Sequence, residues 1–267
     1  MEELTWLQAF IIAVIEGLTE FLPVSSTGHM IIGESLLGVP PTEFVKAFTV
    51  IIQFGAILSV VALYFKRFFQ NWDFYWKLLI AFIPAAVFGF LLSDKIDELL
   101  ESVAVVAVML ILGGVLMLFV DKLFEKTAEN QTITPKKALV IGLCQCVAMI
   151  PGVSRSMATI VGGMSQKLTR QNAAEFSFFL AVPTMFAASA WKVLKLVTHE
   201  ESRQVLAGNL NILLFGNVIA FVVAILAIKF FIGFVSKHGF KAFGWYRIVV
   251  GALLLLLLGL GYDLSIL

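Results

Sequence analysis

Paired carboxylates interrupt an otherwise apolar stretch in the segment "EGLTEFLPVSSTGH", residues 16–29. Glu16 and Glu20 are four residues apart, so on a helix both carboxylates lie on one face, about 6 Å from each other. Like charges at this spacing repel, and one acid at the centre of a membrane helix already costs roughly 2.5 to 3.5 kcal/mol. A divalent cation, a bound proton or a nearby arginine would relieve the repulsion. The pair therefore predicts a metal or proton site. The alternative is that the two acids line a water-filled cavity and take no part in chemistry.

A second polar segment, "PGVSRS" at residues 151–156, supplies an arginine. Pro-Gly followed by small hydroxyl residues predicts a loop that opens a helix. The free N–H groups of such a helix start, next to a guanidinium, form a binding site for an anion. The predicted phosphate ligands of this segment are Arg155, Ser154, Ser156 and Thr159.

The first segment contains a matching hydroxyl-rich loop. Ser25, Ser26 and Thr27 precede a second predicted helix start, and we expect them to bind the same phosphate. Capping of the helix is the alternative role for Ser25 and Thr27. His29 follows directly and is predicted to act as a nucleophile or acid-base group, with a packing role as the alternative.

Together these groups indicate phosphoryl transfer from a membrane-embedded ester, in which positioning and charge neutralisation do most of the work. The predicted catalytic residues are His29, Glu20, Glu16, Arg155 and Ser26, with Glu16 and Glu20 as the metal ligands. His29 is the preferred nucleophile, either attacking phosphorus itself or activating a water. Ser26 is the alternative nucleophile, but a serine needs an adjacent base to compete.

The composition places these groups in a membrane. Of the 267 residues, 60% are hydrophobic and 14% are charged, and the mean hydropathy is +0.97, which indicates an integral membrane protein. No polar linker divides residues 1–267, so we expect a single membrane domain. The net charge of +1 gives no indication of nucleic-acid binding. Cys144 and Cys146 are two residues apart, a spacing that favours packing over a disulfide or a zinc site.

Six apolar stretches are long enough to cross a bilayer core of about 30 Å as helices. They are residues 44–66, 73–92, 103–123, 172–196, 209–232 and 244–264. Two further stretches, 5–38 and 136–165, are interrupted by the polar segments. Lipid does not tolerate the unpaired backbone of such a break, so both breaks must be buried in protein or line a wet cavity. We therefore predict an all-α protein with six full spans and two re-entrant helix hairpins.

The charges predict the orientation. If each hairpin returns to its own side and the six spans cross, thirteen of the nineteen lysines and arginines fall on one side, which the positive-inside rule makes cytoplasmic. These are Lys66, Arg67, Lys77, Lys122, Lys126, Lys136, Lys137, Lys167, Arg170, Lys229, Lys237, Lys241 and Arg247. Both termini then face outside, the first hairpin enters from outside, and the second enters from the cytoplasm. Arg155 is the one basic residue left at membrane depth.

Two hairpins that enter from opposite faces are typical of an inverted-topology repeat. A shift of 129 residues aligns "QAFIIAVIEG" (8–17) with "KALVIGLCQC" (137–146), and the repeat halves are about 1–125 and 132–267. Secondary transporters share this design, so a transporter or flippase for a lipid phosphate, with the Glu pair as its ion-coupling site, is the alternative function. His29 beside a phosphate loop favours an enzyme. The uniformly apolar "GALLLLLLGL" (251–260) faces either lipid or a second copy in a homodimer.

With its two polar motifs, the chain closely resembles the bacterial undecaprenyl-diphosphate phosphatases, the bacitracin-resistance family, over almost its whole length. The resemblance implies hydrolysis of undecaprenyl diphosphate to the monophosphate, which recycles the lipid carrier of cell-wall synthesis in the bacterial inner membrane. It also implies a divalent cation such as Mg or Ca and a pocket open to the outer face. The positions that it assigns to the active site are Glu16, Glu20, Ser26, His29, Ser154, Arg155 and Thr159. Met157 stands where the family usually has glycine, and we expect it to reshape the loop behind Arg155.

Overall fold

The computed structural model describes residues 4–69, 72–100, 102–198, 200–262 and 264. Every regular element in this part of the chain is a helix, as predicted. In chain order the elements are α1 (Trp6–Thr19), α2 (Ser26–Leu36), α3 (Glu43–Leu63), the 3-10 helix η1 (Phe65–Phe69), α4 (Trp72–Leu91), α5 (Ser93–Leu100), α6 (Val103–Leu123), α7 (Pro135–Val147), α8 (Arg155–Ser165), α9 (Arg170–Thr198), α10 (Glu200–Gly208), α11 (Leu210–His238) and α12 (Lys241–Gly259). The last residues of the final predicted span include 263, which lies outside the described residues.

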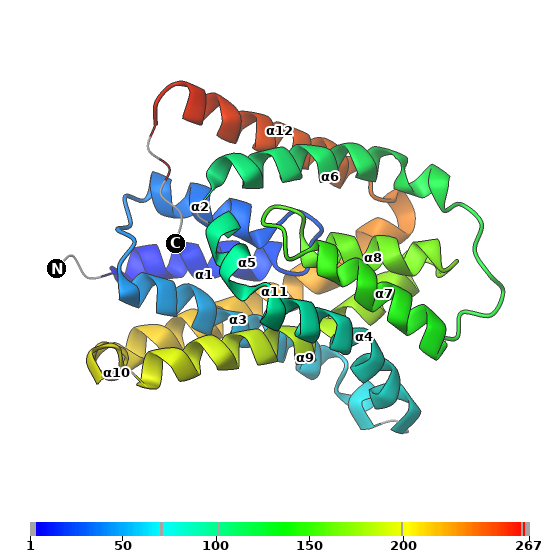
Figure 1. Ribbon diagram of the computed structural model, residues 1–267, viewed down its shortest axis with the longest axis horizontal. Coiled ribbons are helices and arrows are strands. Elements are labelled where there is room, and N and C mark those ends of the chain that lie inside the picture. The colour runs from blue at the N-terminus through cyan, green and yellow to red at the C-terminus, as the bar shows by residue number, and fades with distance from the viewer. Residues whose placement is uncertain (1–3, 70–71, 101, 199, 263, 265–267) are drawn as a thin grey trace.

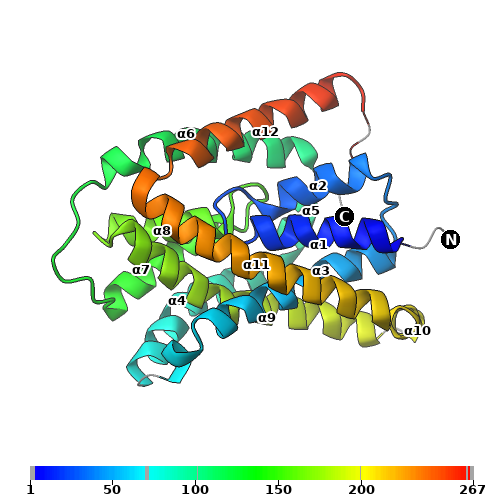
Figure 2. The same cartoon turned by 180° about the vertical axis from the view of Figure 1, so that it is seen from behind.

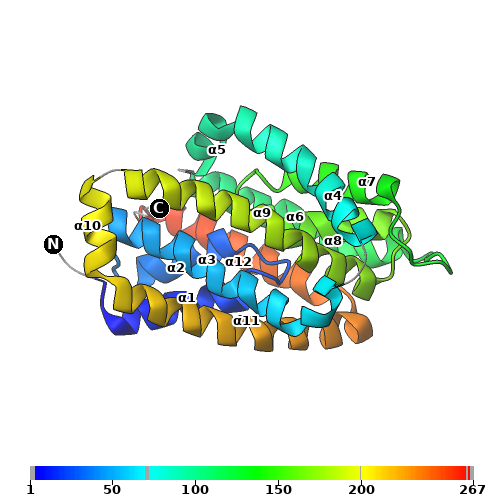
Figure 3. The same ribbon diagram turned by 90° about the horizontal axis from the view of Figure 1, so that it is seen from below.

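Six of these helices are long and apolar enough to cross a membrane: α3, α4, α6, α9, α11 and α12. Each coincides with one predicted span. The single boundary that differs most is the end of α11, which continues past residue 232 to His238 and is followed by Gly239 with a φ of 72°. The short helices α5 and α10 were not predicted, because each lies in a polar stretch too short to span. Figure 3 shows α10 at one end of the molecule, between α9 and α11 in the chain. In the same view α3 lies between α9 and α11.

Both interrupted stretches form a pair of helices separated by a break. The first pair is α1 and α2, and the second is α7 and α8. Figures 1 and 2 show that α1 and α2 occupy one half of the molecule, α7 and α8 occupy the other, and the two breaks come together in the middle. Hydroxyl caps begin the first helix of each pair. Thr5 and Gln8 form a capping box on α1, and Thr134 caps α7 with Pro135 in its first turn.

The backbone at both breaks adopts conformations that side chains disfavour. Ser25 and Ser154 stand directly before α2 and α8 with φ angles of 70° and 76°. Such conformations are uncommon for non-glycine residues and concentrate at functional sites. Gly152 has a φ of 88°, and a Cβ atom there would lie 2.4 Å from the carbonyl oxygen of Val106. The second break therefore requires a glycine at this position.

We expect Gly152→Ala to lower the free energy of unfolding by about 1 to 3 kcal/mol, because alanine adds a clash to an unfavourable φ. Thermal unfolding of the purified protein in detergent measures the effect. Gly233→Ala is the matched control, since Gly233 lies in α11 without a positive φ, and a Cβ atom there would meet no described residue within 4 Å. Equal stability of the two variants would contradict the requirement for glycine at the break.

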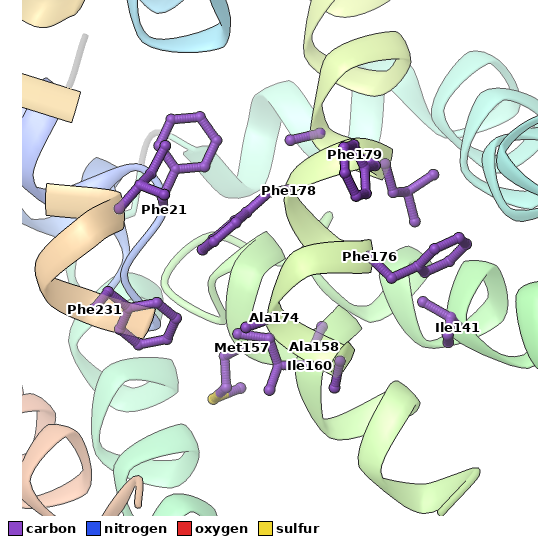
Figure 4. Packing of buried hydrophobic residues seen from close by; sticks show 14 of the residues in the cluster. Phe21, Ile141, Met157, Ala158, Ile160, Ala174, Phe176, Phe178, Phe179 and Phe231 are labelled. Atoms are coloured by element: carbon purple, nitrogen blue, oxygen red, sulfur yellow. The ribbon is translucent and has the colours of Figure 1, made fainter. Parts of the chain in front are cut away.

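The main hydrophobic core surrounds the breaks and draws on both halves of the chain. Figure 4 shows Phe178 from α9 lying next to both Phe21 from the first break and Phe231 from α11. The ring centroids of Phe21 and Phe178 are 5.5 Å apart, and those of Phe178 and Phe231 are 6.0 Å apart. Met157 is also buried in this core, and its sulfur packs against Gly113 of α6, where there is no side chain. The side chain is thus accommodated by α6.

Glycines bring α12 close to α6, and the two helices lie side by side in Figures 1 and 2. A Cβ atom at Gly114 would lie 2.7 Å from the carbonyl oxygen of Gly244, and one at Gly251 would lie 2.7 Å from that of Ala107. Small residues of this kind allow close helix packing in membranes. Leu253 and Leu256 on the other face of α12 are exposed. Whether this face contacts lipid or a second copy stays a prediction.

Candidate active site

The two breaks contact each other through charged and polar side chains. Nη2 of Arg155 lies 3.0 Å from Oε1 of Glu20, and the side chains of this ion pair are only 13% and 8% exposed. The hydroxyl of Ser156 donates to the carbonyl oxygen of Phe21 at 2.7 Å. Two segments more than 120 residues apart in the sequence, residues 20–26 and 151–156, therefore form one polar cluster.

Glu20 also contacts Ser26. The Ser26 hydroxyl donates to Oε2 of Glu20 at 2.8 Å, while Oε1 of the same carboxylate accepts from Arg155. A carboxylate held between a cation and a serine hydroxyl is placed to accept the serine proton, which is the adjacent base that a serine nucleophile requires. The sequence alone did not reveal this base, because the carboxylate and the hydroxyl belong to opposite ends of the break.

Glu16 lies one turn before Glu20 on α1 and is 1% exposed. Its Oε1 is buried and has no hydrogen-bond partner among the described residues. Buried carboxylates without partners are rare, so an orphaned oxygen here indicates a proton or a cation as its natural partner. No cluster of three or more His, Cys, Asp or Glu side chains that could hold a metal occurs in the described part of the chain. The oxygens of the Glu pair are of the kind that Mg²⁺ and Ca²⁺ prefer, and any cation bound there would take its remaining ligands from a phosphate or water.

Arg155 is held in place by α9. Its Nη1 donates to the carbonyl oxygen of Ser177 at 3.1 Å and is 3.4 Å from the Ser177 hydroxyl. The hydroxyl of Thr159 lies 2.6 Å from that of Ser177. The guanidinium also lies over the ring of Phe21, 5.7 Å from its centroid. Its Nε is buried and finds no acceptor within the described residues. Ser177 was missed by the sequence analysis, since nothing marks one serine of a long apolar helix.

The predicted phosphate-binding hydroxyls divide into two groups. Ser156 and Thr159 are buried and make hydrogen bonds within the protein, and Ser154 Oγ accepts from the backbone N–H of Met157 as a helix cap. By contrast, the Ser25 side chain caps no described N–H group at the start of α2. The α2 start is thus less capped than the α8 start and is the better anion site. Thr27, in the first turn of α2, is partly exposed.

His29 is fixed from both sides. Its Nδ1 lies 2.8 Å from the carbonyl oxygen of Ser25, and its Nε2 lies 2.7 Å from the hydroxyl of Tyr246. A carbonyl only accepts, so Nδ1 carries the proton and, in the neutral ring, Nε2 accepts from the tyrosine. The two rings are nearly parallel, with centroids 5.5 Å apart. Among the described residues, no hydrogen bond joins His29 to Arg155 or to the Glu pair.

Arg247 corrects one sequence prediction. It was assigned to the cytoplasmic side, but it is fully buried in α12, so Arg155 is not the one basic residue at membrane depth. Its guanidinium donates to the carbonyl oxygens of Pro23 in the first break, Gly152 in the second, and Met109 and Leu110 in α6, at 2.8 to 3.4 Å. Arg247 therefore joins both breaks. Its position inside the predicted span 244–264 was the available signal.

Comparison with known proteins gives one consistent result. A family model described as "Bacitracin resistance protein BacA" matches residues 9–253. A protein named undecaprenyl-diphosphatase from Porphyromonas gingivalis is 56% identical over 282 residues, covering 98% of this chain and 100% of the relative. Proteins of the same name from Flavobacterium johnsoniae and Aquifex aeolicus are 61% and 43% identical, covering 94% and 91% of this chain and 95% of each relative. The chain therefore belongs to the bacitracin resistance protein BacA family.

Proposed function

We propose that this protein hydrolyses undecaprenyl diphosphate to undecaprenyl phosphate and inorganic phosphate, and so recycles the lipid carrier of cell-wall synthesis. The names of its relatives support this substrate. The structural observation that carries the proposal is the Glu20 carboxylate, which contacts both the hydroxyl of Ser26 and the guanidinium of Arg155. Phosphoryl transfer needs a base, a nucleophile and a cationic group that binds the phosphate. Glu20, Ser26 and Arg155 supply these three parts and contact one another through Glu20.

The terminal phosphate binds between Arg155 and the start of α2. Within the described residues, the buried Nε of Arg155 has no partner and the first N–H groups of α2 lack a side-chain cap, so both are donors in need of an acceptor. Ser26 and Thr27 lie in the first turn of that helix. The prenyl chain extends from this cluster between the membrane spans.

Ser26 is the nucleophile that the contacts favour. Its Oγ attacks the terminal phosphorus as its proton passes to Glu20, and the bond from this phosphorus to the bridging oxygen breaks. Undecaprenyl phosphate leaves with the bridging oxygen and takes the proton from Glu20, so that a phosphoserine and an ionised Glu20 remain. Glu20 then takes a proton from a water that attacks the phosphoserine, and it returns this proton to Ser26 Oγ as inorganic phosphate is released. His29, which was the preferred nucleophile from sequence, is held by Ser25 and Tyr246 and orients the start of α2.

A divalent cation, Mg or Ca, would be held by Glu16 and Glu20. When bound, it supplies positive charge that neutralises the diphosphate and stabilises the leaving group. The orphaned Oε1 of Glu16 supports this assignment. Arg155 supplies a fixed positive charge beside Glu20 that stabilises negative charge on the substrate phosphate.

The helix pairs α1/α2 and α7/α8 are proposed to be re-entrant hairpins of an inverted repeat in the bacterial cell membrane. Their approach from opposite halves of the molecule supports this arrangement (Figure 1), as do the matching φ angles of Ser25 and Ser154. The first pair enters from the outer face, so the site opens outward. Residues 1–267 form one domain with halves of about 1–125 and 132–267.

Phosphate release from undecaprenyl diphosphate by the purified protein in detergent tests the function. We expect release by the wild type that stops with a chelator and returns with Mg²⁺ or Ca²⁺. Arg155→Ala should lower kcat/KM by about 10² to 10³, the cost of losing one fixed donor to transition-state charge. A folded, lipid-supplemented wild type that releases no phosphate would overturn the proposal and return the Glu pair to the role of an ion-coupling site in a transporter.

A further inference from the structure

Buried polar atoms without partners concentrate around the breaks. Within the described part of the chain there are four such side-chain atoms: Glu16 Oε1, Arg155 Nε, Gln145 Nε2 and Glu34 Oε1. The first two belong to groups already assigned to the cation and the phosphate. Gln145 has no role in the proposed mechanism, yet it is 2% exposed and lies on α7 just before the second break.

The Gln145 amide has an N–H group without an acceptor among the described residues in either orientation of the amide. Its Oε1 lies 3.3 Å from the hydroxyl of Thr184, which also lies 2.8 Å from the carbonyl oxygen of Leu180. If the amide is turned, one N–H donates to Thr184 and the other still has no acceptor, because the group carries two. A buried N–H without an acceptor is costly, so an acceptor is expected at this place.

The Gln145 amide and Arg155 contact consecutive residues of α9. Thr184, which contacts Gln145, is followed on α9 by Met185, whose sulfur lies 3.6 Å from Nη2 of Arg155. The Gln145 amide and the guanidinium therefore contact adjacent residues of one helix. Both Gln145 Nε2 and Arg155 Nε are orphaned with respect to the described residues, and both are donors, which is the chemistry of an anion site.

Gln145 also has a structural counterpart in the first half of the chain. It stands nine residues before Ser154, as Glu16 stands nine residues before Ser25, and the two serines share the same unusual backbone conformation. Both side chains lie in the last turn of the helix that precedes a break, are buried, and have one atom without a partner among the described residues. The counterparts differ in what they offer: Glu16 presents an acceptor, and Gln145 presents a donor.

We infer that Gln145 is a further substrate ligand whose amide N–H donates to an oxygen of the diphosphate. This rests on the proposed function, because it assigns a further donor to the same diphosphate. Glu16 holds positive charge near the substrate, and Gln145 binds the substrate anion directly.

The test measures prenyl diphosphate hydrolysis by the full-length protein in detergent, together with inhibition by inorganic pyrophosphate. Gln145→Met keeps the length of the side chain and removes the amide, and we expect kcat/KM to fall about tenfold to hundredfold, as for a lost hydrogen bond to a charged group. The pyrophosphate inhibition constant should rise by a similar factor. Gln145→Glu, which keeps an acceptor and adds a negative charge, should lose at least as much.

Gln53→Met is the matched control. Gln53 is a second glutamine in a membrane helix, where its Oε1 accepts from Ser189, and it should keep kcat/KM and the inhibition constant within about twofold of the wild type. The inference would be overturned if Gln145→Met kept the wild-type kcat/KM and pyrophosphate inhibition constant. It would also be overturned if Gln145→Glu kept both wild-type values. If Gln145→Met fails to fold, Gln145→Glu alone decides by the same two constants. If the folded wild type did not hydrolyse the prenyl diphosphate, the proposed function itself would be contradicted.

Discussion

Replacement of Ser26 by alanine should lower kcat for phosphate release by about 10⁶, the scale seen when a nucleophile is removed from a unit of coupled catalytic groups. The physical reason is the hydrogen bond from the Ser26 hydroxyl to Glu20, which places the base against the attacking oxygen. Substrate labelled at its terminal phosphate should leave an acid-stable, base-labile label on the wild type. The same label should be absent from Ser26→Ala.

Ser59→Ala provides the control for this experiment. Ser59 is buried in α3, where its hydroxyl donates to the carbonyl oxygen of Ala56, and its loss should leave kcat within about twofold. An acid-labile label that persists in Ser26→Ala and disappears in His29→Ala would instead identify a phosphohistidine. That result would restore the histidine preferred from sequence and give Ser26 the role of a phosphate ligand.

Glu20→Gln should lower kcat/KM by at least about 10³. The substitution removes the base of Ser26 and leaves the buried charge of Arg155 without its carboxylate partner. An unpaired buried charge is strongly destabilising, so we also expect a lower midpoint of thermal unfolding. Hydrolysis assays at saturating and limiting substrate, with unfolding measured in the same detergent, separate the loss of chemistry from the loss of fold.

Glu175→Gln tests whether removing any buried carboxylate from an ion pair has this effect. Glu175 pairs with Arg67 at 2.7 Å and is as buried as Glu20, but it lies on α9 away from the breaks. We expect reduced stability with kcat/KM within a few-fold of the wild type. Similar losses of kcat/KM in both variants would show that Glu20 acts through stability, and that the base must be sought elsewhere.

The six spans and the two interrupted stretches were predictable from sequence because apolar length and polar breaks are local properties of the chain. The ends of α11 and the helices α5 and α10 were not, since they depend on caps and short amphipathic segments at the ends of the spans. The breaks themselves were found from the carboxylates and hydroxyls at 16–29 and 151–159. That they contact each other followed from the idea of opposed hairpins, and the Arg155 to Glu20 ion pair is consistent with it.

The candidate site was predicted less completely, for a different reason. Motif residues such as Glu16 and Arg155 stand out because they are ionisable within apolar sequence. Ser177 and Tyr246 support Arg155 and His29 from helices distant in the chain, and one sequence contains no information on such pairings. The pairing of Ser26 with Glu20 rather than with His29 depends on the path of the loop between α1 and α2, which spacing rules for helices cannot describe.

The burial of Arg247 has a consequence for the biogenesis of the protein. The helix that carries this arginine, α12, is synthesised after α1 to α11, yet its guanidinium binds carbonyl groups of both breaks, which are made much earlier. A nascent chain that has inserted α1 to α11 contains every motif residue but lacks this connection between Pro23 and Gly152. The hydrogen bonds that join the two breaks through Arg247 therefore form only once α12 has been inserted.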